Sequence, residues 1–178
     1  MGPISAAAVA ALALAAGASS TDSPDPRPLH AREDCSTRSE ARFRGAYTNP
    51  RNLVVGPLAM IAAGVPTDAQ TVREFGGNKF PLLVKAGHKV TVRIARSVRG
   101  TAALGYGPLP QGEVRVRDGY RSVTFVACRA GRPTFWSGFV LAREPVCVPL
   151  RVFVDGARPP ERAEISLGEN CDPPEAGG

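Results

Sequence analysis

The clearest alternation of apolar and polar positions lies in residues 80–94, FPLLVKAGHKVTVRI. In its second half Val90, Val92 and Ile94 are apolar, whereas the two positions between them carry Thr and Arg. Side chains two residues apart share one face of a strand. The segment therefore predicts a strand, a turn at residues 85–88, and a second strand with one buried face and one solvated face.

Short apolar segments of the same kind recur along the chain, separated by Gly, Pro and Asp-Gly turns. They predict strands at Arg42–Tyr47, Asn52–Ala63, Ala102–Tyr106, Glu113–Arg117, Ser122–Cys128, Thr134–Leu141, Cys147–Val154 and Glu164–Leu167. One helix is predicted at Asp68–Phe75, with Thr67 and Gln70 as a capping box, Gly76-Gly77 at its end, and Val72 and Phe75 on one side. Many short strands and one short helix predict an all-β fold, an antiparallel β-sandwich.

Parts of the sequence resemble a known class of β-domain. The apolar strand, the Ala86-Gly87 turn and the alternation after it are similar to the opening strands of bacterial immunoglobulin-like domains. With GPLAMIAAG, KFPLLVKAGHKVTV, VTFVAC and TFWSGFVLA in this order, the chain resembles exported actinobacterial proteins of uncharacterised function. This resemblance implies an immunoglobulin-like domain and offers no activity to carry over. The position of Trp136 after Cys128, rather than before it, departs from the antibody pattern.

The first part of the chain predicts the compartment. Ile4–Ala18 is a run of about fifteen small apolar residues that ends in Ala16-Gly17-Ala18, as in a cleaved export signal, although no Lys or Arg precedes it. It is shorter than the roughly twenty residues of a transmembrane helix. We expect a signal peptide at 1–18, a disordered linker at 19–34, one β-sandwich domain at 35–171 and a flexible tail at 172–178. The expected location is outside the cytosol, secreted or at the cell envelope.

Four cysteines, Cys35, Cys128, Cys147 and Cys171, form an even set without a C-x-x-C motif. In an oxidising compartment such a set predicts two disulfides. Three connectivities are open, and we favour Cys128–Cys147 with Cys35–Cys171. The first bond would bracket a predicted hairpin, and the second would join the two ends of the domain.

Positive charge is the main compositional signal for a partner. The net charge is +6, and three of the 22 basic residues are lysines while the rest are arginines. Codon bias of a GC-rich genome explains such an excess of arginine, and attraction to a polyanion is the functional alternative. No consecutive basic run indicates a nucleic-acid arm, so we expect no nucleic acid as partner. An anionic polymer of the cell envelope or an acidic protein surface is the expected partner.

The candidate binding residues are of two kinds. Arg93, Arg115, Arg117 and Arg121 would gather on one sheet face if their segments pair, and could then bind phosphate or carboxylate groups; a solvated polar row is the structural alternative. Trp136, two residues before Gly138, would stack on a sugar ring if exposed or fill the core if buried. A carbohydrate-binding module is thus the alternative function.

Catalysis has little support in the sequence. The predicted domain holds one histidine, His88, and no G-x-S-x-G motif, so we expect a protein that is not an enzyme, with a hydrolase as a further alternative. Glu113, Asp118, Glu144 and Glu164 could supply a carboxylate pair for glycoside hydrolysis. A blue-copper site needs two histidines and a free cysteine, which the predicted domain lacks, so we expect neither a metal nor another cofactor.

Overall fold

The computed structural model describes Gly2 and residues 29–171 of the chain. The predicted signal peptide apart from Gly2, residues 19–28 of the predicted linker and the predicted tail at 172–178 lie outside the described residues.

The described chain is mostly β structure with one α-helix. Its strands are β1 (His30–Glu33), β2 (Leu53–Val55), β3 (Leu58–Met60), β4 (Gly77–Lys79), β5 (Leu82–Val84), β6 (Lys89–Ile94), β7 (Ala102–Gly105), β8 (Ser122–Val126), β9 (Thr134–Trp136), β10 (Phe139–Ala142), β11 (Val146–Val154) and β12 (Glu161–Leu167). The helix is α1 (Ala69–Phe75), and two 3₁₀ turns are η1 (Arg96–Val98) and η2 (Val116–Asp118). The predicted all-β class is confirmed.

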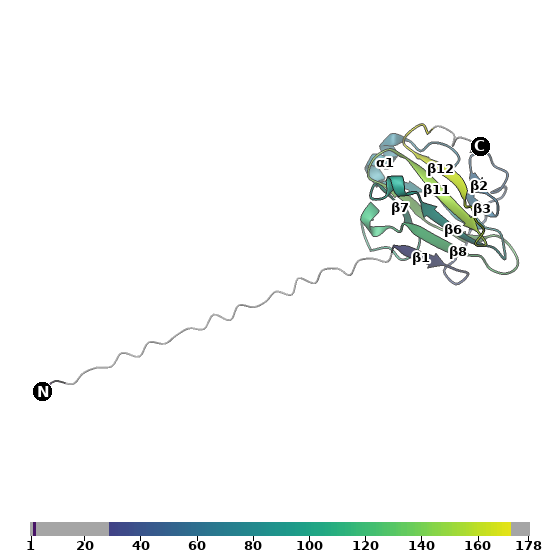
Figure 1. The fold of residues 1–178 in the computed structure, drawn as a ribbon, viewed down its shortest axis with the longest axis horizontal. Helices are drawn as coiled ribbons and strands as arrows, with labels where there is room; N and C mark the ends of the chain where they lie inside the picture. Colours follow the sequence, from purple (N-terminus) through teal and green to yellow (C-terminus); the bar gives the residue numbers. More distant parts are fainter. Residues whose placement is uncertain (1, 3–28, 172–178) are drawn as a thin grey trace.

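The strands form three sheets that pack together. The largest has the order β1-β8-β6-β11-β12, and its strands run side by side across Figure 1. The others have the orders β4-β10-β7 and β2-β3-β5-β9. All strand pairs are antiparallel except β1 with β8, which is parallel.

The core lies between the inner face of the five-stranded sheet and the two smaller sheets. The inner face contributes side chains such as Val92, Phe125 and Leu150, and the smaller sheets contribute Met60 and Trp136, all nearly fully buried in one cluster. Each such side chain removed from water stabilises the fold by about 1.5–3 kcal/mol. The buried apolar positions of β6 and β8 alternate along the strands as predicted, and Ser122 at the start of β8 is buried in addition.

The segment 80–94 supplies strands to two different sheets. The predicted strands form as β5 and β6, and the turn at Gly87 has a positive φ of 81°. However, β5 pairs with β3 and β9, whereas β6 pairs with β8 and β11. The predicted strand at 134–141 divides in the same way, into β9 and β10 in two sheets. These crossings join the sheets around the core.

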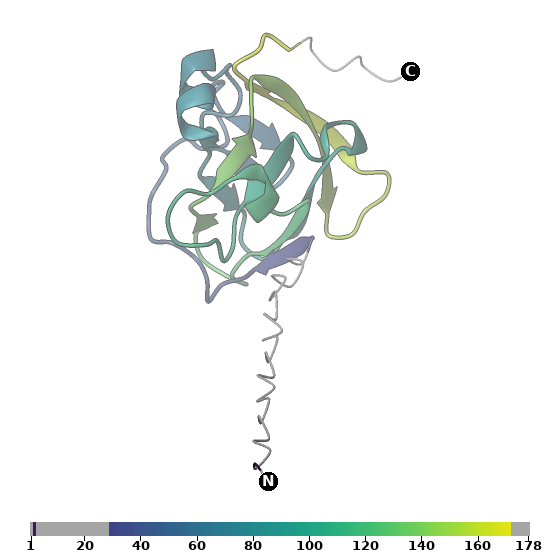
Figure 2. The ribbon, with the colours of Figure 1, turned by 90° about the vertical axis from the view of Figure 1, so that its left-hand side faces the viewer.

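The predicted linker boundary at residue 34 is wrong. Residues 30–33 form β1, and this strand lies parallel to β8 with His30 opposite Ser122 and Glu33 opposite Phe125. Figure 2 shows β1 at the end of the domain opposite α1. The polar composition of this segment hides a strand because β1 is an edge strand whose outer side chains, such as that of Arg32, are exposed.

Two disulfides form, as predicted, but with another connectivity. The bonds are Cys35–Cys128 and Cys147–Cys171, and the favoured pairs Cys128–Cys147 and Cys35–Cys171 are wrong. The reason is strand order, because β6 lies between β8 and β11 and keeps Cys128 away from Cys147. The parallel β1–β8 pairing instead carries the chain from Glu33 to Cys35 beside the end of β8.

Three smaller expectations are also corrected. Residues 42–47 and 113–117 form turns and the 3₁₀ turn η2 rather than strands. Helix α1 begins one residue later than expected, because Asp68 rather than Thr67 accepts the hydrogen bonds of the first turn. Its C-cap is Gly76, as predicted, with a left-handed φ of 67°. Of the two apolar side chains expected on one side, Val72 is buried and Phe75 is exposed.

Candidate functional site: an arginine cluster on the outer sheet face

The outer face of the five-stranded sheet carries a row of arginines. Arg93 on β6 lies directly opposite Arg151 on β11, and Arg151 lies directly opposite Arg162 on β12. Neighbouring strands are about 4.8 Å apart, so this row crosses three strands within about 10 Å. Like charges in directly opposite positions are unfavourable for sheet stability. The row therefore brings three positive charges together on neighbouring strands.

More arginines gather beside this row. Some desolvation, together with the positive charges of Arg96, Arg121, Arg93 and Arg151, lowers the pKa of the Arg99 guanidinium. These four charges thus lie within electrostatic range of Arg99; they come from β6, η1, the residue before β8, and β11. We call the residues of this region the arginine cluster: Arg93, Arg96, Arg99, Arg121, Arg151 and Arg162.

Arg93 is held at the centre of the cluster. Its guanidinium carbon lies 5.2 Å from the ring centre of Phe153, which shares the outer face of β11 with Arg151. This cation–π contact fixes the side chain along the sheet. Its Nε is buried and has no hydrogen-bond partner among the described residues. The carboxylate ion pairs of Arg38 and Arg115 involve no member of the cluster.

The four predicted arginines are divided between two surfaces. Arg93 and Arg121 belong to the cluster, whereas Arg115 and Arg117 lie at η2, beside β7 of the three-stranded sheet. The expected gathering of all four on one face does not occur, because residues 113–117 form no strand. Arg151 and Arg162 were not among the residues predicted from the sequence. Their signal was the alternation in VCVPLRVFV and ERAEISL, where both arginines occupy polar positions.

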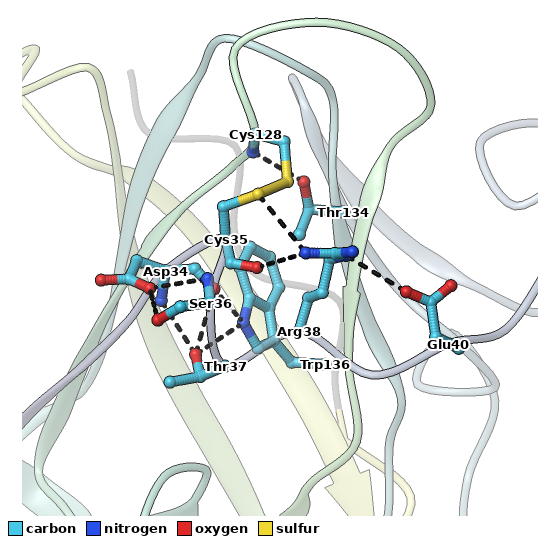
Figure 3. A network of polar contacts seen from close by, with 9 residues as sticks. All are labelled: Asp34, Cys35, Ser36, Thr37, Arg38, Glu40, Cys128, Thr134 and Trp136. Carbon is cyan, nitrogen blue, oxygen red and sulfur yellow. Dashed lines mark hydrogen bonds and ion pairs between the residues drawn. A yellow bond between two sulfur atoms is a disulfide. The ribbon is translucent and has the colours of Figure 1, made fainter.

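Trp136 is a core residue. It is 1% exposed, and its Nε1–H donates to the backbone carbonyl of Asp34 at 3.2 Å and to Thr37 Oγ1 at 3.3 Å. Figure 3 shows the indole beneath the Cys35–Cys128 disulfide, where these bonds tie the first described segment to β9. A sugar ring cannot stack on a buried indole, so Trp136 is no binding platform. Its large side chain fills part of the core instead.

Gly138 does leave room for a ring, but the ring belongs to the protein. A Cβ at residue 138 would lie 2.1 Å from Cδ1 of Tyr106. Tyr106 is 1% exposed, its hydroxyl donates to the carbonyl of Phe80 at 2.5 Å, and burial raises the pKa of its phenol. The glycine therefore serves core packing and not ligand binding.

His88 forms part of an exposed acid–base pair. Its Nδ1 lies 2.8 Å from Oδ2 of Asp155, and Asp155 also accepts a hydrogen bond from the backbone N–H of Lys89 at 2.8 Å. The Lys89 bond and then the His88 bond lower the pKa of Asp155. This pair resembles two members of a triad, but no serine, threonine or cysteine side chain bonds to the ring within the described chain.

The candidate carboxylates do not form an acid–base pair for glycoside hydrolysis. Glu113 and Asp118 both bond to Arg115, and the hydrogen bond from that guanidinium lowers the pKa of Glu113. A general acid needs a raised pKa. Glu144 follows β10, and Glu164 lies on β12. The pKa of Glu33 is raised by burial, but this carboxyl faces the core from β1.

One group of potential metal ligands occurs in the described chain: Cys147, Cys171 and Glu164. Both sulfurs are joined in a disulfide, and a disulfide offers no thiolate to a metal. The described residues contain no helix with the length and apolar character needed to cross a membrane.

No protein-family model matches the chain, and no curated protein matches it. The arginine cluster is therefore interpreted from its own chemistry.

Proposed function

We propose that this protein is an exported, non-enzymatic β-sandwich module that binds an anionic polymer of the cell envelope through the arginine cluster. The observation that carries this proposal is the row Arg93–Arg151–Arg162 across three neighbouring strands. A polymer with closely spaced phosphate, sulfate or carboxylate groups would offset the repulsion within the row. Guanidinium groups bind such anions through paired hydrogen bonds.

The shape of the cluster favours a polymer over a small anion. Its arginines extend from η1 and the start of β8, across β6 and β11, to β12 at the sheet edge. A single phosphate contacts one or two of these side chains, whereas a chain of anionic groups laid across the strands contacts several. Many weak ionic contacts made together give an affinity that falls steeply with salt.

The proposed location outside the cytosol is supported by two observations. The described chain holds two disulfides and no free cysteine, as is usual for proteins in oxidising compartments. The apolar run Ile4–Ala18 has the pattern of a cleaved export signal.

The alternatives have weaker support. A carbohydrate-binding module built on Trp136 is opposed by the burial of its indole. A hydrolase would use the pair of His88 and Asp155, and that pair has no nucleophile bonded to it among the described residues. We therefore carry neither forward.

The test compares two triple variants with the same change in net charge. The first, Arg93→Gln/Arg121→Gln/Arg151→Gln, removes half of the arginine cluster; the second, Arg73→Gln/Arg115→Gln/Arg117→Gln, removes exposed arginines elsewhere. Binding to immobilised polyphosphate and dextran sulfate is measured over a range of salt, with uncharged dextran as the blank. We expect the first variant to lose affinity at least about tenfold, or about 1.4 kcal/mol, and the second to lose much less.

Two results would contradict the proposal. One is an equal loss in both variants, because net charge alone would then explain the binding. The other is retention of the wild-type protein on uncharged dextran with no dependence on salt.

A further inference from the structure

A second basic surface lies over β10 of the three-stranded sheet. It is a cleft of about 700 Å³ between the end of α1 and the loop that leads into η2. In this loop Val114 and Val116 pack against Ala103 and Leu141 of the sheet. They cover only part of the sheet, and Phe139 at the start of β10 remains 40% exposed. The cleft is the uncovered part of this face.

Two exposed aromatic rings line the cleft. Phe75, the last residue of α1, is 74% exposed, and Phe139 is the other ring. In the described chain the exposed large apolar side chains are Leu29, Val54, Phe75 and Phe139, so both exposed phenyl rings lie at one site. Covering such a ring contributes about 1.5–3 kcal/mol to binding or folding. Most of this free energy is still available at Phe75, and a smaller part of it at Phe139.

Positive charge surrounds the rings. Four arginines line the cleft, Arg73, Arg115, Arg117 and Arg143, together with two acids, Glu74 and Glu113. A third acid, Asp118, lies beside Arg115 and accepts a hydrogen bond from its backbone N–H. Glu113 pairs with Arg115 at 3.0 Å, and Glu74 accepts a hydrogen bond from Gln70 at 2.7 Å. The arginines outnumber the acids, so the rim of the cleft is cationic while part of its lining is aromatic.

We propose that this cleft binds a small amphipathic organic anion, an aromatic or alicyclic ring that carries an acidic group. The ring would cover Phe75 and Phe139, and the acidic group would contact the arginines of the rim. An uncharged apolar ligand would make no ionic contact with the arginines of the rim, and a ringless anion would leave the phenyl rings exposed. The volume is that of a site for one small molecule. This site is independent of the proposed polymer-binding face.

The test uses a fluorescent pair of probes that differ in one acidic group. Anilinonaphthalene sulfonate carries a sulfonate, and N-phenylnaphthylamine is its uncharged analogue. We expect the sulfonate to bind once per chain and about tenfold more tightly than the analogue. Phenyl phosphate should displace it, and inorganic phosphate at the same concentration should not.

Substitutions of residues that line the cleft test whether the probe binds there. We expect Phe75→Ser, and separately Arg117→Gln/Arg143→Gln, to weaken sulfonate binding at least about fivefold. All three side chains are exposed, so both variants should fold, which an unchanged thermal transition verifies. The matched control Arg93→Gln/Arg151→Gln removes two arginines of the other surface and should bind as the wild type does. Equal affinity for both probes, wild-type binding by Phe75→Ser, or an equal loss in the control would overturn the proposal.

Discussion

At the scale of single residues, the absence of a side chain at Gly138 decides how the core closes. The ring of Tyr106 lies against the backbone of this residue, and its hydroxyl satisfies the carbonyl of Phe80. Gly138 also separates β9 from β10, so the close approach occurs where the chain passes from one sheet to another. Gly138 is therefore needed both for the packing of Tyr106 and for the passage of the chain between two sheets.

We expect Gly138→Ala to destabilise the protein by about 1–3 kcal/mol or more, because its Cβ would overlap the Tyr106 ring and force the core apart. The free energy of unfolding in urea measures the effect. Ser137→Ala, at the exposed neighbouring residue, is the matched control and should change stability little. A Gly138→Ala protein as stable as this control would show that Tyr106 moves aside without cost.

The alternation of apolar and polar residues predicts which side chains are buried better than it predicts what a given side chain does. The alternation in β6 and β8 identifies their buried side chains, because a strand of a packed sheet exposes alternate positions to the core. The role of Trp136 depends instead on what covers it. The segment at Asp34 and Thr37 does so, and this segment is about a hundred residues away in sequence.

At the scale of elements, most strands follow from local sequence and their partners do not. The strands β5 and β6 are separated by one tight turn and still belong to different sheets. Local alternation tells which side of a strand is buried, but the partner of a strand is chosen by the layer that it packs against. The wrong pair Cys128–Cys147 follows from this, since it assumed that strands near in sequence are near in space.

The two disulfides should differ in their contribution to stability. Cys35–Cys128 closes a loop of 93 residues, and Cys147–Cys171 closes one of 24. Since a longer loop restricts the unfolded chain more, we expect Cys35→Ser/Cys128→Ser to lose about 4–5 kcal/mol and Cys147→Ser/Cys171→Ser about 3–4 kcal/mol.

Unfolding in urea without reductant measures both losses, and peptide mapping of the unreduced protein verifies the pairs. A larger loss from the shorter loop would show that native contacts near Cys147 outweigh chain entropy. Peptides that join Cys128 to Cys147 would contradict the strand order itself.

At the scale of the whole molecule, two surfaces carry groups of arginines to which we assign a binding role. The arginine cluster lies on the outer face of the five-stranded sheet, and the aromatic cleft lies over the three-stranded sheet. The opposite placement of Arg93, Arg151 and Arg162 brings like charges together, and our proposal of an anionic partner rests on this placement.

We expect Arg151→Gln to raise stability and lower polymer affinity at the same time. Removing the central charge of the row relieves repulsion worth about 0.2–1 kcal/mol at low salt. The gain should shrink at about 1 M salt, where charges are screened within about 3 Å. Urea unfolding at both salt concentrations measures it, and Arg143→Gln, outside the cluster, is the control. A stability loss in Arg151→Gln at low salt would show that the row is held by contacts and not strained by repulsion.

The sequence by itself determined the β class, most strands and their buried faces, the helix with its Gly76 cap, and the oxidation of the four cysteines. These features depend on neighbours along the chain or on composition. Only the tertiary structure decided which strands pair, which cysteines bond and which arginines share a face. Those outcomes depend on contacts between segments far apart in sequence. Strand pairing places Arg151 and Arg162 on the same sheet face as Arg93, whereas Arg115 and Arg117 lie at η2.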